Sequence, residues 1–237
     1  MHNNTLGPPS SLSPCLPLSL SLPLPAQDLR TNVGTWAVLD RELPALAYAL
    51  TQALPTEKFD KSFLGQRLET TYLDTRSFVL RKARVKGDKY LTLRIRCYQP
   101  SGMYALSAKT EFGKYRLTLE SNVAEDILAN GFQQRFWNQL PSDLIARLMD
   151  LAGENVPVPV VAVCFKRYAV ENDIDRLTLD IDINTDCGKQ LPYSVLEYKT
   201  SDEGPETSDK QLVTRPSSLA TFLRPIKLSK FLWSTRT

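Results

Sequence analysis

Alternation of apolar and polar residues dominates the central part of the chain. The segments 90–98, 104–109 and 114–120 each alternate with a period of two, and turn residues such as Pro100 and Gly113 separate them. This pattern is typical of antiparallel strands joined by tight turns. Further strands are predicted over 33–39, 68–72, 157–170, 175–183 and 193–199.

Three other segments have apolar residues at helical spacing, namely 41–54, 122–151 and 217–224. Residues 201–216 are polar and are predicted to form a loop, and 228–234 is predicted to be an end strand or a turn. Because strands dominate and no repeat of fixed period occurs, one β-rich α+β domain explains the pattern better than two domains.

The N-terminal segment has a different composition from the rest. Residues 7–27 are rich in proline, serine and leucine, and prolines at 14, 17, 23 and 25 would break an apolar helix. We interpret 1–29 as a low-complexity, disordered leader, or as the product of a mistaken start codon, with a secretory or lipoprotein signal as the alternative. The folded domain is then 30–237. No apolar run reaches the ~20 residues of a membrane-spanning helix.

The histidine and cysteine content limits which catalytic and metal sites the protein can have. The one histidine among the 237 residues is His2, which excludes a Ser-His triad, a zinc site with histidine ligands and a haem held by histidine. The four cysteines form no Cys-x-x-Cys pair, which predicts free thiols in a reducing compartment and a cytoplasmic location. A net charge of only +3 argues against a protein that coats nucleic acid.

The polar faces of the predicted strands are selectively basic. Arg94 and Arg96 share one face, as do Lys114 and Arg116, because residues two apart in a strand point the same way. Five more cations lie in strand-like sequence: Lys109, Arg167, Arg176, Lys199 and Lys230. By the same spacing, Glu197 shares a face with Lys199, and Asp180 is predicted to share one with Asp182.

Two interpretations of these basic faces are open. Each strand by itself is typical of a solvated polar face, but in a closed or nearly closed barrel the same faces would line a lumen. The cationic side chains of such a lumen would repel one another unless the lumen held a polyanion. Arginine and lysine side chains suit phosphate oxygens. A remaining carboxylate would then hold Mg²⁺ or Mn²⁺. A nucleic-acid partner is disfavoured, because Tyr98 and Tyr115 are interpreted as facing away from the arginines beside them.

Segments along the chain resemble, in order, those of the polyphosphate polymerase domain of the vacuolar transporter chaperone (VTC) family, within the triphosphate tunnel metalloenzymes. The segments are YLDT (72–75), LRIRCY (93–98), SAK (107–109), KYR (114–116), FKRYA (165–169), DRLTLD (175–180), YSVLEYK (193–199) and LSKF (228–231). The resemblance runs from about Leu68 to Trp233. It implies an antiparallel β-barrel tunnel with a few flanking helices, whose interior binds triphosphate groups with Mn²⁺ or Mg²⁺.

The resemblance also implies roles for individual residues. Catalytic contacts with phosphate would come from Arg94, Arg96, Lys109, Arg167 and Arg176. Further substrate contacts would come from Lys114, Arg116, Lys199 and Lys230, and from either Arg81 or Arg84. Glu197 would be the metal-binding carboxylate, and Asp74 is interpreted as a turn residue rather than a ligand.

This sequence also departs from the family pattern, at Thr35, Ser107 and Phe165, where the family has lysine, glutamate and tyrosine. The site thereby lacks one cation and at least one carboxylate.

The leading hypothesis is an ATP-dependent inorganic polyphosphate polymerase. The alternatives are a hydrolase of tripolyphosphate or nucleoside triphosphates, and a catalytically impaired polyphosphate-binding module. ATP and inorganic polyphosphate are the expected partners, and the membrane-embedded subunits of family members leave a membrane-protein partner open.

Overall fold

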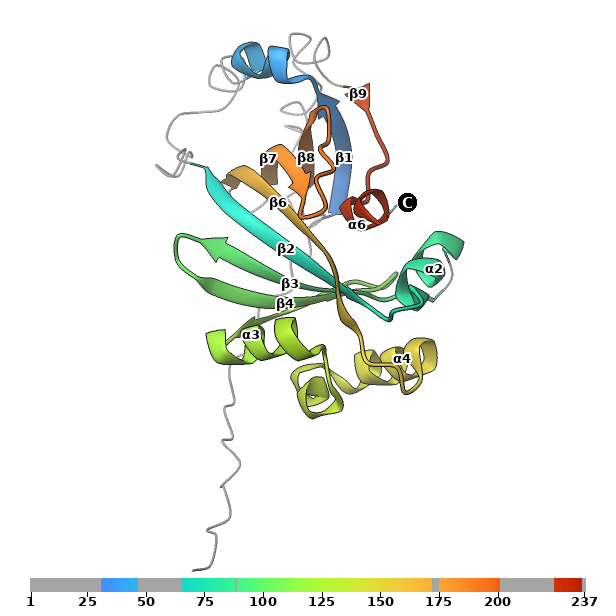
Figure 1. Cartoon of the computed structure of the whole chain (residues 1–237). Coiled ribbons are helices and arrows are strands. Elements are labelled where there is room, and N and C mark those ends of the chain that lie inside the picture. Colours follow the sequence, from blue (N-terminus) through green and yellow to red (C-terminus); the bar gives the residue numbers. More distant parts are fainter. Residues whose placement is uncertain (1–30, 47–64, 88, 172–174, 201–223, 236–237) are drawn as a thin grey trace, which may run out of the picture.

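One curled antiparallel sheet forms the centre of the protein. The computed structural model describes residues 31–46, 65–87, 89–171, 175–200 and 224–235. Nine strands follow the order β5-β4-β3-β2-β6-β7-β8-β1-β9, and the neighbouring strands pair antiparallel. The sheet curls without closing, and helices flank it (Figure 1).

The strands are β1 (Thr31–Val38), β2 (Gln66–Asp74), β3 (Thr92–Gln99), β4 (Met103–Lys109), β5 (Lys114–Leu119), β6 (Val158–Glu171), β7 (Asp175–Thr185), β8 (Ser194–Thr200) and β9 (Arg224–Pro225). The α-helices are α2 (Val79–Lys86), α3 (Ser121–Asn130), α4 (Ser142–Ala152) and α6 (Lys230–Ser234), and the 3-10 helices are η1 (Asp40–Glu42) and η3 (Gln134–Gln139). Among the described residues, no helix is long and apolar enough to cross a membrane.

The predicted strands are confirmed with small shifts at their ends, and the predicted meander is the run β3-β4-β5. The single helical segment predicted over 122–151 is instead divided into α3, η3 and α4. Gly131 follows α3 with a φ of +83°, which glycine adopts without steric cost. Pro141 precedes α4, where its missing N–H is not needed by the helix.

One prediction near the C-terminus was wrong. The segment 228–234 is not an end strand or turn, because Lys230–Ser234 form the short helix α6. The Ser229 hydroxyl starts that helix by accepting a hydrogen bond from the backbone N–H of Leu232 at 3.4 Å. Arg224, the last residue of the helix predicted over 217–224, lies in β9.

Other predictions fall partly or wholly outside the described residues. The leader, the loop 201–216 and residues 217–223 are outside them. Of the helix predicted over 41–54, the described part is η1 followed by one helical turn at 43–46. The domain boundary near residue 30 therefore stays a prediction.

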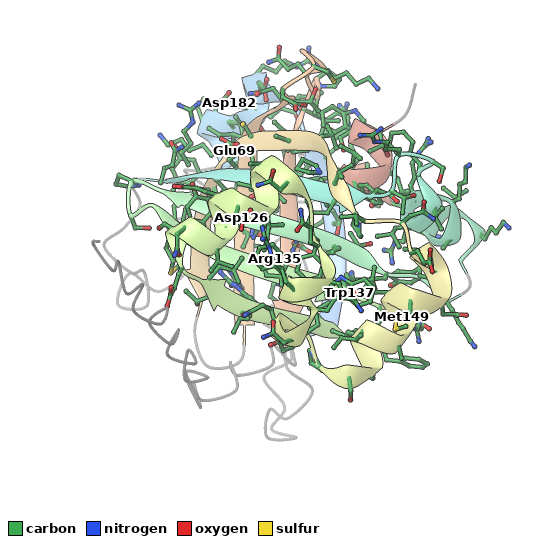
Figure 2. The ribbon with its side chains drawn as sticks, turned by 60° about the horizontal axis from the view of Figure 1, so that its bottom comes forward. Glu69, Asp126, Arg135, Trp137, Met149 and Asp182 are labelled. Atoms are coloured by element: carbon green, nitrogen blue, oxygen red, sulfur yellow. The ribbon has the colours of Figure 1, made fainter. Side chains whose placement is uncertain are left out.

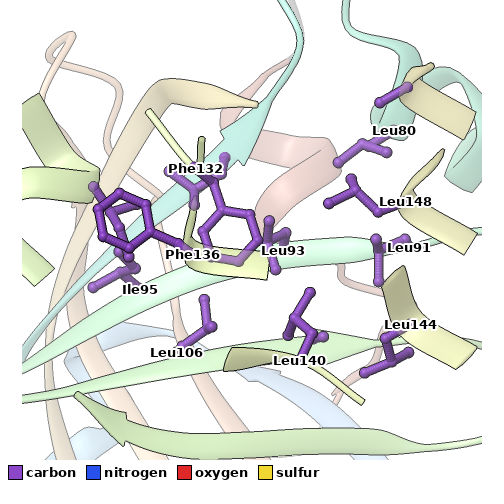
Figure 3. Close-up of a cluster of buried hydrophobic side chains, with 14 of the residues drawn as sticks. Leu80, Leu91, Leu93, Ile95, Leu106, Phe132, Phe136, Leu140, Leu144 and Leu148 are labelled. Atoms are coloured by element: carbon purple, nitrogen blue, oxygen red, sulfur yellow. The ribbon is translucent and has the colours of Figure 1, made fainter. Parts of the chain in front are cut away.

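The helices α3, η3 and α4 cover the outer face of the β2–β5 part of the sheet. Figure 3 shows how Leu93, Ile95 and Leu106 pack against Phe132 and Phe136 there, in one fully or largely buried apolar cluster. Burial of each such side chain contributes roughly 2 kcal/mol. In Figure 2 these helices lie across the sheet, with Arg135 near Asp126; the two form an ion pair of 2.7 Å at the surface.

This packing decides which way the charged residues point. Leu93 and Ile95 are buried beneath the helices, so Arg94 and Arg96, which alternate with them on β3, face the concave side of the sheet. The concave side also has an apolar cluster of its own, which includes Leu68, Phe165 and Phe231. The sheet therefore presents one face to a helix-covered core and the other to a partly charged interior.

Candidate functional site

A cavity of about 400 Å³ lies on the concave side of the sheet. All eleven residues that the sequence analysis placed in the site line this cavity: Arg84, Arg94, Arg96, Lys109, Lys114, Arg116, Arg167, Arg176, Glu197, Lys199 and Lys230. We call this space the cationic cavity. The structure therefore brings the residues together, while their roles in binding and catalysis stay predictions. Arg81, the alternative to Arg84, is absent from the described lining.

Strand register spaces the cations along the cavity wall. Ser107 on β4 lies directly between Arg94 on β3 and Arg116 on β5. One row further along, Lys109 of β4 is opposite Lys114 of β5. Ser107 is small, uncharged and only 4% exposed. At this position, where the VTC polymerases that the sequence resembles have a glutamate, the wall therefore carries no negative charge between the two arginine positions.

The crowding of cations changes their proton affinities. Burial, followed by the charges of Arg94, Arg96 and Arg116, lowers the pKa of Lys114 to about 6. Burial and the charges of Arg94 and Arg167 lower the pKa of Arg96 to about 9. Burial and neighbouring cations also lower the pKa of Lys109. Such shifts mean that the cations lining the cavity destabilise one another, which favours an anionic ligand.

Asp180 is a buried carboxylate on the concave face, and its partners are two cationic side chains of the protein itself. It is 2% exposed, accepts hydrogen bonds from Arg167, and also accepts one from the ammonium group of Lys230. The prediction that Asp180 and Asp182 share a face was wrong. An irregularity in the β6–β7 register and a φ of +53° at Asp182 turn that residue to the surface, where Figure 2 labels it.

Tyr98 also differs from its interpretation in the sequence analysis. It lies two residues from Arg96 on β3 and therefore shares its face, and Arg116 donates a hydrogen bond to its hydroxyl group. Tyr115 does face away from the neighbouring arginine, and its hydroxyl donates to the backbone carbonyl of Gln139 at 3.1 Å. Tyr98 lines a second hollow of about 410 Å³, which shares Arg96, Arg116, Arg167 and Arg176 with the cationic cavity.

Asp74 positions the helix that carries Arg84. Its carboxylate accepts hydrogen bonds from the backbone N–H groups of Leu80 at 2.9 Å and Arg81 at 2.8 Å, which lie in the first turn of α2. Asp74 is the last residue of β2, just before the turn at residues 76–77, and its carboxylate binds the start of α2. From the last turn of α2, Arg84 reaches the cavity and stacks over the ring of Tyr90, with 3.8 Å between the guanidinium carbon and the ring centroid.

The cavity fits a divalent cation only if the ligand supplies most of the coordination. Among the described residues, no group of three or more His, Cys, Asp or Glu side chains gathers where it could hold a metal ion. Glu197 is the one carboxylate in the described lining, and its ion pair with Lys199 spans 3.9 Å. Mg²⁺ commonly binds through one or two carboxylates, waters and substrate phosphates, so Glu197 is compatible with a cation shared with a phosphate chain.

Sequence reasoning missed several residues in the lining, among them Thr92 and Thr178. Threonine is common in strands, and alternation alone would only have placed Thr178 on the face of Arg176 and Asp180. Thr35 had been singled out only as a departure from the family, and it lies in the lining opposite Glu197. The polar but uncharged part of the site therefore became visible only in the folded chain.

No protein-family model and no curated protein matches the sequence. Solved structures do match. A candidate adenylate cyclase from Bacillus halodurans is 16% identical over 85% of this chain and 92% of its own, with a TM-score of 0.54. A candidate adenylyl cyclase from Hippeastrum, described as having a dominant triphosphatase activity, is 17% identical over 86% of this chain and 95% of its own, with a TM-score of 0.53. A candidate adenylate cyclase from Vibrio parahaemolyticus is 12% identical over 85% of this chain and 97% of its own, with a TM-score of 0.50.

The chain has the triphosphate tunnel fold. The predicted α+β class with an antiparallel tunnel and a few flanking helices is therefore confirmed, although the sheet is curled rather than closed. At these identities the likeness concerns the fold. The finer resemblance to the VTC polymerases stays a prediction.

Proposed function

We propose that the cationic cavity binds the triphosphate group of inorganic tripolyphosphate or of a nucleoside triphosphate, and that the protein hydrolyses it. The observation that carries this proposal is the lining itself, in which ten arginine and lysine side chains face one space with a single carboxylate among the described residues. A lining of this kind suits a ligand with several closely spaced negative charges, and guanidinium groups match phosphate oxygens in shape. The triphosphatase activity described for the Hippeastrum protein of the same fold favours hydrolysis.

The residues would act mainly by positioning and by stabilising charge. In phosphoryl transfer the negative charge is spread over the oxygens of the transferred group, and no protein nucleophile is required. Arg94 and Arg116, on either side of Ser107, would hold one phosphate between two guanidinium groups. Lys109 and Lys114 would hold the neighbouring phosphate one row along. A Mg²⁺ or Mn²⁺ ion held by Glu197 and the phosphate oxygens would further neutralise the transferred group.

A polymerase is the second candidate, because the ordered segments that resemble the VTC polymerases all contribute to this part of the fold. In that case the terminal phosphate of a growing chain would take the place of water, and a nucleoside diphosphate would leave. A polyphosphate-binding module without turnover is the third. The same binding residues serve all three, so product analysis has to distinguish them.

The test uses the purified full chain with Mn²⁺ or Mg²⁺ and either tripolyphosphate or ATP. Orthophosphate is measured, and a stained gel resolves polyphosphate chains, with and without a short primer. Orthophosphate without chains is the expected result. Long chains would instead establish the polymerase, and tight binding without either product would establish the binding module.

A matched pair of variants links the activity to the cavity. Arg94→Gln removes a charge from the cavity wall and is expected to abolish turnover. Arg135→Gln removes a charge on the helix-covered side of the protein, where Arg135 pairs with Asp126, and is expected to leave turnover unchanged. Equal activity of the two variants, or the absence of tripolyphosphate binding by the wild type, would refute the proposal.

A further inference from the structure

Arg84 is held in the cationic cavity in a different way from the cations that strands carry. Eight of the ten arginine and lysine side chains in the described lining come from strands, where pairing and alternation fix their direction. Arg84 comes from the last turn of α2, which lies beside the sheet (Figure 1). An arginine side chain loses rotamer freedom when it binds a ligand, so a contact that fixes it beforehand strengthens binding.

Tyr90 provides such a contact. The guanidinium carbon of Arg84 lies 3.8 Å from the centroid of the Tyr90 ring. The ring is itself attached to the sheet, because its hydroxyl group donates a hydrogen bond of 2.9 Å to the backbone carbonyl of Thr110, the residue after β4. A guanidinium group that stacks on an aromatic ring can still donate hydrogen bonds from the N–H groups along its edge. The stack therefore orients Arg84 without using up its donors.

The two ends of α2 are thus fixed by different residues. Asp74 binds the backbone N–H groups of the first turn, and Tyr90 contacts the side chain of Arg84 in the last turn. Tyr90 is not among the described residues that line the cationic cavity. Any effect of Tyr90 on a ligand in the cavity would therefore act through Arg84.

Arg84 meets the sheet at the last row of the cavity wall. Thr92 of β3, Lys109 of β4 and Lys114 of β5 lie side by side in that row, just before the β4–β5 turn. Burial, followed by the charge of Arg84, lowers the pKa of Lys109, which agrees with a short distance between the two cations. A phosphate group in the last row would therefore lie within reach of a cation from the sheet and a cation from the helix.

We propose that Tyr90 is a positioning residue, which stacks on Arg84 and holds its guanidinium group beside Lys109, where both cations bind the phosphate in the last row. Tyr90 lies outside the segments that resemble the VTC polymerases. This inference rests on the proposed function, because it needs a phosphate chain in the cavity.

A double-mutant cycle between Tyr90 and Arg84 tests the proposal. The probe is imidotriphosphate, a triphosphate analogue that resists hydrolysis, titrated calorimetrically into the full chain. Tyr90→Leu removes the ring and should weaken binding about fivefold to tenfold. Arg84→Gln should weaken it about tenfold or more. Because Tyr90 acts through Arg84, adding Tyr90→Leu to Arg84→Gln should change the affinity by less than about twofold.

Conservative variants separate the stack from general effects on the fold. Tyr90→Phe keeps the ring and should bind within about twofold of the wild type. Arg84→Lys keeps the charge but loses the planar group, so it should weaken binding about fivefold without any change at Tyr90. Tyr168→Leu is the matched control, because it removes a ring that lies 5.3 Å from the ammonium group of Lys166, outside the described cavity lining. This variant should bind as the wild type does.

Three results would overturn the proposal. They are wild-type affinity in Tyr90→Leu, the same loss from Tyr90→Leu with and without Arg84, and wild-type affinity in Arg84→Lys. Thermal melting shows which variants are folded, and Arg84→Lys tests the stack even if Tyr90→Leu does not fold. If the wild type does not bind the analogue at all, the proposed function fails as well. Binding by the wild type with additive effects of the two substitutions would remove only the role of Tyr90.

Discussion

Arg167 and Asp180 face each other across β6 and β7 and form a two-point ion pair, with Nε–Oδ1 and Nη2–Oδ2 distances of 2.6 and 2.7 Å. Lys230 donates to the same carboxylate from α6, so this group also attaches the C-terminal helix to the sheet. Burial by itself would raise the pKa of Asp180, but the charges of Arg167 and Lys230 hold it well below its usual value. The carboxylate therefore stays ionised inside the protein.

Substitution of Asp180 should destabilise the fold. Asp180→Asn leaves two buried cations without their counter-charge, so the free energy of unfolding, measured by urea denaturation, should fall by about 3 kcal/mol. Asp182→Asn, at the exposed position two residues along, should change it by less than about 0.5 kcal/mol. Saturating tripolyphosphate should restore part of the loss, because the ligand supplies negative charge. Equal stability of both variants would show that the ion pair contributes little.

Replacement of Arg96 should weaken tripolyphosphate binding without lowering the stability of the fold. Arg96 is 8% exposed, its Nε donates to the hydroxyl of Thr70 at 3.0 Å, and burial with neighbouring cations lowers its pKa to about 9. Arg96→Met keeps much of the side-chain volume and removes a poorly stabilised charge. The melting temperature should stay the same or rise, while tripolyphosphate affinity falls by about tenfold or more.

The control for Arg96→Met is Arg67→Met, at an exposed position on β2 outside the cavity lining. Arg67→Met should change neither the melting temperature nor the tripolyphosphate affinity. A large drop in the melting temperature of Arg96→Met with unchanged affinity would show that Arg96 has a structural role and does not bind the ligand.

Triphosphate binding should take up a proton at Lys114. Arg94, Arg96, Arg116 and Lys199 surround this ammonium group, and burial together with their charges lowers its pKa to about 6. At pH 7 the group is therefore mostly neutral in the free protein, and the negative charge of a bound triphosphate raises its pKa. Affinity should then be highest below pH 6 and should decrease, by up to about tenfold per pH unit, until the pH passes the raised pKa of the complex.

Calorimetry at pH 7 in buffers of different ionisation enthalpy measures this proton uptake directly. Lys114→Met has no proton to gain, so the uptake should drop to the part that comes from the ligand itself. Without ligand, the low pKa of Lys114 means that the unfolded chain binds more protons than the folded one between pH 6 and about 10, so stability should rise with pH over that range. The same proton uptake in wild type and Lys114→Met would contradict the assignment.

The alternation of side chains was enough to predict which charged residues share a face, and helix packing on the other face then decided their direction. Leu93 and Ile95 alternate with Arg94 and Arg96, and burial of the apolar pair beneath the helices forces the arginines to the concave face. The same reasoning holds for Lys114 and Arg116 on β5, whose neighbours Tyr115 and Leu117 pack against the helix-covered core. It failed at Asp182, because a local irregularity in the sheet interrupts the period of two.

The sequence by itself determined the strands and which charged residues share a face, because two-residue alternation is a property of each strand taken alone. The tunnel class of the fold came from the family resemblance and not from alternation. Only the tertiary structure decided which side chains meet. Thr35 and Glu197 are 162 positions apart in the sequence, yet they lie side by side because β1 pairs with β8. The pairing of Asp180 with Arg167 and Lys230, and the position of Lys230 on a helix, likewise depend on register and docking between distant segments. Such contacts depend on the packing of the whole sheet, and no local pattern of residues is enough to predict that packing.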